Sequence, residues 1–198
     1  MTNMILLGAA CTVAAYLLGS FSSAVIVTQL MGLPDPRTSG SGNPGATNVL
    51  RLGGKKAAAL TLFFDTFKGL LAVLIAAYFT QQTSILMLTA LGTFLGHLYP
   101  LFFRFRGGKG VATGFGAILG LAWPVALCML GTWLLMAALF RYSSLAALTA
   151  AGLAPLYMGL LGQDTNYIVG TALISLLLAW RHRANIRNLF QGCERKIG

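Results

Sequence analysis

Charged residues are scarce in this sequence, and acidic ones are scarcer still. Only 9% of the 198 residues are charged, and Asp and Glu together account for four of them. A soluble domain carries about 25% charged residues, whereas 57% of this chain is hydrophobic. The composition excludes an ordinary soluble domain. It predicts one integral membrane domain that covers residues 1–198.

The small number of cysteines and carboxylates excludes several kinds of site. Cys11 and Cys128 lie in apolar runs and Cys193 lies in the tail, so we expect packing residues or free thiols and no disulfide framework. Near the polar motifs only Asp35 supplies a carboxylate among the motif residues, which is too few for a site with several Asp, Glu or His ligands. We therefore predict no metal and no cofactor. The sequence also lacks a Ser-His-Asp arrangement and the His-x4-Asp pattern of one large acyltransferase class.

Basic residues, in contrast, are plentiful: 14 Lys and Arg give a net charge of +10. Nucleic acid is one explanation for such a charge. The high hydropathy favours two others, orientation in a membrane and binding of anionic ligands, so we predict no nucleic-acid partner. No basic residue precedes Arg37, and the first apolar run is long. We therefore interpret that run as a permanent membrane span and not as a cleavable signal.

Long apolar runs alternate with short polar segments, which predicts an all-α polytopic bundle of about seven transmembrane helices. Asp65 and Lys68 share one helix face and can pair, and a functional role and a purely structural pair are equally open. Gly92 and Gly96 form a small-residue face for close helix contact. The run 111–122 is too short to cross untilted, so whether it spans or re-enters stays open. The expected helices cover residues 4–31, 53–79, 85–102, 111–122, 125–140, 144–161 and 167–187.

If these spans alternate in direction, the polar segments separate into two groups. The Ser39–Asn48 loop, the Arg104–Gly110 loop, Arg141 and the 181–196 tail fall on one side, together with nearly all Lys and Arg. The positive-inside rule makes that side cytoplasmic and places the N-terminus outside. The polar segments can then form one site at the cytoplasmic surface.

The segment Ser39–Asn48, followed by Arg51, combines glycine and proline with several hydroxyl and amide side chains. Glycine permits positive φ, so successive backbone N–H groups can converge on one anion. The planar guanidinium of Arg51 suits phosphate. We expect no regular helix or strand here and interpret the segment as a phosphate-binding cradle, with a flexible connector as the alternative. Its candidate ligands are Gly40, Ser41, Gly42, Asn43, Thr47, Asn48 and Arg51.

A second polar segment, Arg104–Gly110, precedes a predicted helix and contains Lys109 among three glycines. The free N–H groups and positive dipole of a helix N-terminus suit an anion, so we expect phosphate binding at Gly107–Gly110. The alternative is a basic cluster that meets lipid headgroups. The spacing of a nucleotide P-loop is absent, which argues against ATP. Nearby His97 is either a hydrogen-bonded interior group or a member of the site.

A third polar segment follows the last apolar run. Helical spacing places His182 and Asn185 on one face, with Arg181 and Arg183 beside them and Arg187 a turn later. A positive-inside anchor would explain the arginines, but it requires neither the histidine nor the asparagine. His182 and His97 are the only side chains that titrate near neutral pH and could accept a proton.

Taken together, three motifs resemble the signature loops of the bacterial acyl-phosphate:glycerol-3-phosphate acyltransferases, the PlsY family. They are Gly40-Ser-Gly-Asn-Pro-Gly-Ala-Thr-Asn48, Gly107-Gly-Lys-Gly-Val-Ala-Thr113 and Arg181-His-Arg-x-Asn-Ile-Arg187. The similarity covers essentially the whole chain. It implies transfer of a fatty acyl group from acyl phosphate to the 1-hydroxyl of glycerol 3-phosphate, giving lysophosphatidic acid and inorganic phosphate in the bacterial cytoplasmic (inner) membrane. It also implies no metal, contact with membrane lipids, and an upstream enzyme that forms acyl phosphate as a candidate partner.

The resemblance suggests roles for the residues of the three loops. The first loop would hold one phosphate, Lys109 and the adjacent glycine amides would hold the other or polarise the acyl carbonyl, and His182 and Asn185 would position the glycerol hydroxyl. The proton acceptor is either His182 or a substrate phosphate. The expected catalytic residues are His182, Lys109, Asn185 and Ser41. The expected binding residues are Gly40, Ser41, Gly42, Asn43, Thr47, Asn48, Arg51, His97, Gly107, Gly108, Lys109, Gly110, Arg181, Arg183 and Arg187.

An organophosphate transporter or flippase is the rival interpretation, because the same polar groups would serve binding without chemistry. Transporters of this kind place their site near the bilayer midplane between inverted repeats. The sequence shows no internal repeat, and its polar loops gather at one surface.

Overall fold

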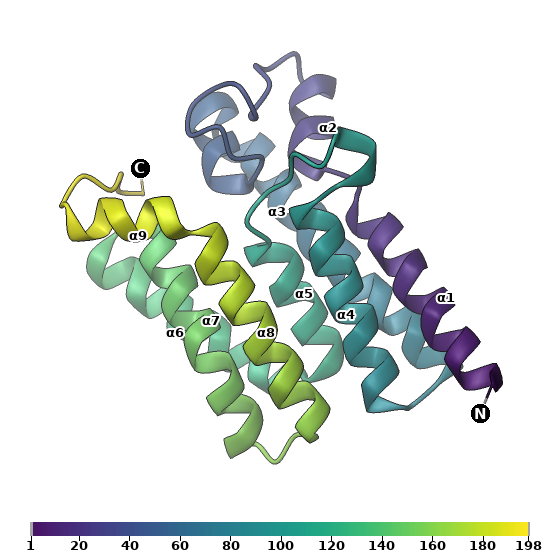
Figure 1. Cartoon of the computed structure of the whole chain (residues 1–198). Coiled ribbons are helices and arrows are strands. Elements are labelled where there is room, and N and C mark those ends of the chain that lie inside the picture. Colours follow the sequence, from purple (N-terminus) through teal and green to yellow (C-terminus); the bar gives the residue numbers. More distant parts are fainter. Residues whose placement is uncertain (1, 198) are drawn as a thin grey trace.

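The computed structural model describes residues 2–197, and every regular element in that range is a helix (Figure 1). The polypeptide forms an elongated bundle in which helices far apart in sequence lie side by side. In chain order the elements are α1 (Thr2–Gly19), α2 (Ser23–Leu30), α3 (Ala46–Phe79), α4 (Thr83–Leu98), the 3₁₀ turn η1 (Leu101–Phe103), α5 (Val111–Leu121), α6 (Trp123–Phe140), α7 (Ser143–Leu160), α8 (Thr165–Arg181) and α9 (Arg183–Phe190).

The lengths of the helices fit a multi-pass membrane protein. Within residues 2–197, five helical stretches are long and apolar enough to cross a membrane, and α5 is a shorter apolar helix. The all-α polytopic fold is thereby confirmed, whereas the number of about seven spans stays a prediction. The five stretches are Thr2–Leu30, Ala46–Phe79, Thr83–Phe103, Trp123–Phe140 and Ser143–Leu160.

Glycines permit close contact between the helices. Helix α1 packs along α4, and a Cβ added at Gly96 would lie 2.2 Å from the Tyr16 carbonyl oxygen. One turn earlier, a Cβ at Gly92 would lie 2.6 Å from the carbonyl oxygen of Thr12. The predicted small-residue face is confirmed. Between lipid-exposed helices such proximity supplies van der Waals contact, because lipid tails are as apolar as the side chains.

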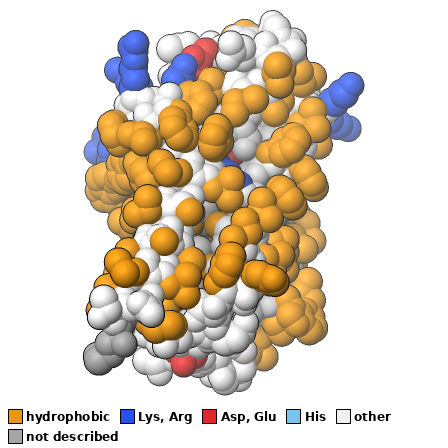
Figure 2. Space-filling model, turned by 90° about the vertical axis from the view of Figure 1, so that its right-hand side faces the viewer, with side chains coloured by type: hydrophobic (Ala, Val, Ile, Leu, Met, Phe, Trp, Pro, Cys, Tyr) orange, Lys and Arg blue, Asp and Glu red, His pale blue; other side chains and the backbone are white. Residues whose placement is uncertain are grey.

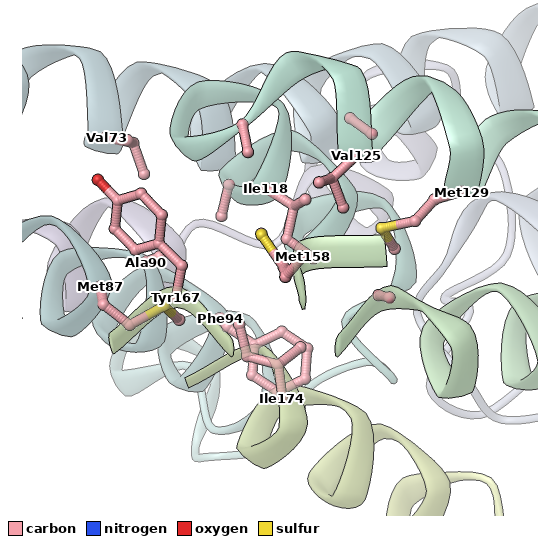
Figure 3. Close-up of a cluster of buried hydrophobic side chains, with 14 of the residues drawn as sticks. Val73, Met87, Ala90, Phe94, Ile118, Val125, Met129, Met158, Tyr167 and Ile174 are labelled. Atoms are coloured by element: carbon pink, nitrogen blue, oxygen red, sulfur yellow. The ribbon is translucent and has the colours of Figure 1, made fainter. Parts of the chain in front are cut away.

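Helix α5 lies inside the bundle, against α3, α4, α6 and α8. A Cβ at Gly116 would lie 1.9 Å from the Thr66 carbonyl oxygen of α3, so the two backbones nearly touch. The buried side chains around α5 form one apolar cluster that also takes in α4, α7 and α8 (Figure 3). Phe94, Ile118 and Met158 lie in this cluster and are at most 1% exposed. Because this core packs around α5, it holds the N-terminal end of that helix in place within the bundle.

Four predicted helix boundaries were wrong. The third helix was expected to reach residue 102, but α4 ends at Leu98 and a 3₁₀ turn follows. The first helix breaks between Gly19 and Ser23, where polar residues interrupt the apolar run, so it forms α1 and α2. Helix α3 begins at Ala46, so the last three residues of the first polar loop are helical and not irregular as expected; Gly54, at φ 74°, then kinks the helix. The last helix ends at Arg181, and α9 follows after a break at His182.

The polar segments gather at one end of the bundle. In Figure 1 the loop between α2 and α3, the loop before α5, α9 and the C-terminal segment lie at the same end, opposite the N-terminal end of α1. On the face shown in Figure 2, Lys and Arg side chains likewise lie toward one end, and hydrophobic side chains cover the middle. The structure therefore brings the polar loops together at one end of the bundle, as the sequence predicts.

The contact between α1 and α4 generates a stability prediction. Gly96→Ala adds one methyl group, which would lie 2.2 Å from backbone and cannot be accommodated by rotating a side chain. We expect it to destabilise the protein by about 1–3 kcal/mol, the usual cost of overpacking. The measurement is thermal unfolding in detergent.

Gly152→Ala in α7 is the matched control, because no atom lies within 4 Å of the added Cβ. Its unfolding temperature should stay the same or rise slightly, since alanine favours helix. Equal losses for both variants would contradict a specific α1–α4 contact.

Candidate active site

A pocket of about 180 Å³ lies at the polar end of the bundle. It brings together the loop before α3, the first turns of α3, α5 and α7, the end of α4, the junction of α8 and α9, and the C-terminal segment. Its walls contain cations, amides and hydroxyls. Of the predicted site residues, it contains Ser41, Asn43, Thr47, Asn48, Arg51, His97, Lys109, Gly110, His182 and Asn185.

The first polar loop is shaped by the side chain of Asn48, which is 2% exposed. Its Oδ1 accepts from the Ser41 backbone N–H at 2.9 Å, and its Nδ2 donates to the Pro36 and Ser39 carbonyls at 3.0 Å each. Gly40, at φ 66°, leaves room for this contact, because a Cβ there would lie 2.2 Å from Asn48 Oδ1. The amide of Asn48 is thus used within the loop, and it holds Ser41 at the pocket wall.

Helix α3 starts directly beneath this loop. Its N-cap, Gly45, has no side chain to accept from the first N–H groups, and Ala46, Thr47 and Arg51 line the pocket. Thr47 Oγ1 lies 3.1 Å from Ser143 Oγ, which joins the start of α3 to the start of α7. Free N–H groups at a helix N-terminus, together with a guanidinium, make this wall suitable for an anion.

The second polar loop is clamped from two sides. Gly108 N donates to the His97 carbonyl oxygen at 3.1 Å. From the opposite side, Arg181 donates through Nε to the Gly108 carbonyl at 3.1 Å and through Nη2 to the Gly107 carbonyl at 2.8 Å. The guanidinium of Arg181 therefore holds loop backbone, and Lys109, the next residue, projects into the pocket.

Lys109 is the central cation of the pocket. Its Nζ donates to Asn185 Oδ1, which links the second and third polar segments. Burial lowers the pKa of Lys109, the carboxylate of Glu194 opposes this shift, and the positive charges of Arg181 and Arg51 reinforce it. The pocket therefore concentrates positive charge where little water screens it.

His182 lies at the break between α8 and α9 and is 3% exposed. Its Nδ1 lies 2.8 Å from the Leu178 carbonyl oxygen, so Nδ1 carries the proton and Nε2 is left as an acceptor. Burial first, and then the charge of Lys109, lower the pKa of His182 to about 4. The imidazole is therefore neutral at physiological pH and offers an acceptor in a pocket full of donors.

The C-terminal segment supplies a carboxylate that the sequence analysis did not single out. Glu194 Oε1 accepts from Ser144 Oγ at 2.6 Å and from Asn185 Nδ2 at 2.7 Å, and Asn188 Nδ2 donates to Oε2 at 3.3 Å. The segment is also tied to the α6–α7 turn, because Ile197 N donates to the Arg141 carbonyl. Glu194 is one of only four acidic residues, and that rarity is the signal that could have found it.

Other residues of the pocket were also missed by sequence reasoning. Ser143 and Ser144 begin α7, and Leu62 and Trp133 line the inner wall, beside Asp65, for which the sequence left a functional role open. Serine at the start of a helix is commonplace, and apolar residues in a span carry no signal of a site, so only the fold reveals them.

Several predicted binding residues do not line this pocket. Gly107 and Gly108 are buried residues of the second loop, and Gly40 and Gly42 adopt positive φ in the backbone of the first. Arg183 lies over the Trp180 ring at 4.7 Å. The pocket lining also omits Arg181, which clamps the second loop, and Arg187, which is exposed. For these residues direct substrate contact stays a prediction without support from the pocket geometry.

An apolar pocket of about 300 Å³ adjoins the polar one. The two share Leu62, Val111, Ala112, Trp133 and Ala147, so one continues into the other. The apolar pocket runs along α7 past Ala150, Ala151 and Ala154, between α5, α6 and α8. Such a pair of pockets suits a molecule with an anionic head and an apolar tail.

Metal ligation is not apparent in the described part of the chain: among residues 2–197, no three or more His, Cys, Asp and Glu side chains group to hold an ion. The polar groups present are instead those that bind phosphate through cations and N–H donors. Fold and site together define an integral membrane protein with a pocket at one end of its helix bundle that suits an anionic amphiphile.

Comparison with known proteins assigns the family. The sequence profile described as glycerol-3-phosphate acyltransferase matches residues 9–192. The glycerol-3-phosphate acyltransferase of Methylococcus capsulatus is 55% identical over 184 residues, covering 93% of each chain. That of Thioalkalivibrio sulfidiphilus is 54% identical over 193 residues, covering 98% of this chain and 95% of its own.

Solved structures agree with this assignment. The crystal structure of PlsY (YgiH), an integral membrane glycerol 3-phosphate acyltransferase, in its glycerol 3-phosphate form superposes with a TM-score of 0.93 at 40% identity over 96% of both chains. Its lysophosphatidic acid form gives 0.90 at 39% identity, covering 96% of this chain and 95% of the other. The chain belongs to the glycerol-3-phosphate acyltransferase family, as the resemblance of its motifs predicted.

Proposed function

We propose that this protein transfers a fatty acyl group from acyl phosphate to the 1-hydroxyl of glycerol 3-phosphate, releasing lysophosphatidic acid and inorganic phosphate. The observation that carries the proposal is the junction of the two pockets, where a cation-rich chamber opens into an apolar one. Both reactants carry phosphate, and one carries a fatty chain. Family membership and the solved relatives, named for glycerol 3-phosphate and lysophosphatidic acid forms, support the same reaction.

The reaction forms one ester bond and breaks one acyl-phosphate bond. The glycerol hydroxyl oxygen attacks the acyl carbonyl carbon, and the bond from that carbon to the phosphate oxygen breaks as phosphate leaves. Negative charge develops on the carbonyl oxygen and on the leaving phosphate. Lys109 and the free N–H groups at the start of α5 stabilise this charge, while Arg51 and Ser41 hold phosphate at the start of α3.

His182 orients the attacking hydroxyl in this scheme. Its Nε2 is an acceptor, so it receives the hydroxyl hydrogen bond, and Asn185 is held beside it by Lys109 and Glu194. A pKa of about 4 makes His182 a weak base. A phosphate monoester has its second pKa near 6, so a substrate phosphate oxygen is the stronger proton acceptor of the two.

The cellular setting follows from the distribution of charge. We place the protein in the bacterial cytoplasmic membrane, with the pocket at the cytoplasmic side and the N-terminus outside, because basic side chains gather at the pocket end. Acyl phosphate then reaches the apolar pocket from the inner leaflet. An enzyme that forms acyl phosphate is the expected supplier, and no nucleic acid is involved.

A transporter or flippase for an organophosphate is the second candidate. A transport site would have to open to both sides of the membrane. The observed polar pocket lies at one end of the bundle, and the pocket that continues from it is apolar, which supports the enzyme.

Purified protein in detergent distinguishes the two functions. With acyl phosphate and labelled glycerol 3-phosphate, we expect a labelled lipid product in the absence of any membrane. Lys109→Met should reduce kcat/KM roughly tenfold to a hundredfold or more, because hydrogen bonds to charged groups contribute about 1.5–3 kcal/mol. Lys55→Met makes the same change at an exposed site outside the pocket and should leave turnover unchanged. Binding without product would favour the transporter.

The pH dependence separates the two proton acceptors. We expect His182→Gln to reduce kcat about tenfold while the acid limb keeps its midpoint near 6, since His182 stays neutral above its pKa of about 4. The measurement is kcat between about pH 3 and 8. A wild-type limb near pH 4 that disappears in the variant would instead identify His182 as the base.

Unfolding controls accompany this pH profile. The folded pKa of His182 lies below its ordinary value of 6.5, so the associated stability is present above pH 6.5 and is lost as pH falls toward 4. Activity is therefore compared only at pH values where both proteins remain folded.

The apolar pocket predicts a change in chain-length preference. Ala154 lies seven residues beyond Ala147 on α7, so its side chain is about 10 Å deeper along the helix. Ala154→Leu should fill the deep end and lower kcat/KM for a long-chain relative to a medium-chain acyl phosphate by about tenfold. Ala138→Leu, on the exposed face of α6, is the control and should not change that ratio. An unchanged ratio for Ala154→Leu would exclude this pocket as the acyl site.

A further inference from the structure

A cluster of ionisable side chains lies buried beneath the second polar loop. Asp65 and Lys68 of α3 form an ion pair of 2.8 Å, and His97 of α4 lies 3.1 Å from Lys68 Nζ and 3.5 Å from Asp65 Oδ1. All three side chains are at most 7% exposed. Charged residues inside a span are costly and usually functional. The reaction scheme above gives this cluster no task.

The contacts of Lys68 fix the state and orientation of the His97 ring. Lys68 Nζ donates to the Phe21 carbonyl oxygen, at the break between α1 and α2, at 2.8 Å. An ammonium group only donates hydrogen bonds, so His97 Nδ1, which faces it, must accept, and the neutral ring carries its proton on Nε2. Thr113 Oγ1 of α5 lies 3.2 Å from the same Nδ1. Side chains from α3 and α5 therefore hold this ring of α4 in one orientation.

The second polar loop rests directly on the held histidine. Gly108 N donates to the His97 carbonyl oxygen at 3.1 Å, and a Cβ at Gly107 would lie 2.1 Å from that oxygen. A Cβ at Gly108 would lie 2.3 Å from His97 Nε2 and 2.9 Å from the Pro44 carbonyl oxygen. The first polar loop, the second polar loop and the imidazole thus meet at one point, immediately before Lys109.

We propose that His97 is a positioning residue for acyl transfer: its ring and carbonyl seat Gly107 and Gly108, and thereby place the Lys109 ammonium in the pocket. Asp65, Lys68 and Thr113 keep the ring in the orientation that the seat requires. Arg181 presses the same two residues from the other side. This inference rests on the proposed function, because it assigns His97 an effect that passes through Lys109.

A double-mutant cycle tests the proposal. His97→Asn keeps an acceptor near Nδ1 for Lys68 but removes the half of the ring on which Gly108 lies. We expect kcat/KM to fall about tenfold or more when Lys109 is present. In a Lys109→Met background the same change should cost less than about threefold, because the group that His97 positions is already gone. Equal losses in the two backgrounds would overturn the proposal.

Thr93→Val is the matched control on the same helix. Thr93 is fully buried one turn before His97, and its hydroxyl has no partner among the described residues. Its substitution should leave kcat/KM unchanged in both backgrounds, and a loss that depends on Lys109 would overturn a specific role for His97.

A second variant keeps the test decisive if His97→Asn does not fold. Thr113→Val removes one hydrogen bond to Nδ1 and leaves the ring, so a smaller loss, about threefold, should again occur only with Lys109 present. Equal losses would contradict the proposal as before. Turnover by the wild-type protein in the same assay tests the proposed function separately. If the wild type forms no product, the proposed reaction is wrong. If product forms but the effects of the His97 and Lys109 substitutions are independent, only the proposed role of His97 is wrong.

Discussion

The mutual repulsion of cations gathered around one partly buried lysine is the constraint on which this structure depends. Lys109 lies within the field of Arg51 and Arg181, and burial already disfavours its charge. The chain compensates with its own groups: Asn185 accepts from Lys109, Glu194 adds a negative charge, and backbone carbonyls of the second loop accept from Arg181. A site that stabilises negative charge during a reaction must be organised in this way beforehand, because rearranging dipoles during the reaction would cost free energy.

The bundle provides that organisation through backbone contacts more than through side chains. Gly96 lies against α1 and Gly116 against α3, so the helix backbones nearly touch, and the ends of α4 and α5 are fixed relative to each other. The loop that joins those ends is therefore also held in a defined position. The side chain of Asn48 holds the first polar loop in the same way. Its amide group makes three hydrogen bonds to the loop backbone, where glycines and prolines prevent regular structure.

Much of this arrangement could be predicted from the amino-acid sequence because membrane physics leaves few alternatives. Long apolar runs must be helical, and the alternation of spans predicts that Ser41, Lys109 and His182 lie at one end of the bundle. The pairing of Asp65 with Lys68 followed from their spacing, and the structure shows that ion pair. The break at His182 was missed, because Arg181-His-Arg carries no helix-breaking residue. The start of α3 was missed because a loop rich in glycine masked the helical turn that follows Gly45.

Roles were harder to infer than positions. Arg181 and Asn48 are residue types that bind phosphate, yet their donors are used on the protein's own backbone, and only the fold reveals which donors are already occupied. Glu194 illustrates the opposite case. It lies in a short polar tail without periodicity, and it becomes part of the pocket because that segment folds back onto α7 and α9.

The short length of α5 and its buried start affect how substrate binding depends on ionic strength. Its 11 residues span about 16 Å, and the glycines before it, Gly107, Gly108 and Gly110, are all buried. The positive end of this helix dipole therefore lies in the buried wall of the polar pocket, where the effective dielectric constant is lower than at the protein surface. Added salt will weaken the attraction of exposed arginines for an approaching anion over a Debye length of about 10 Å, but will screen the field of α5 far less. Capture of substrate and its retention should thus respond differently to salt.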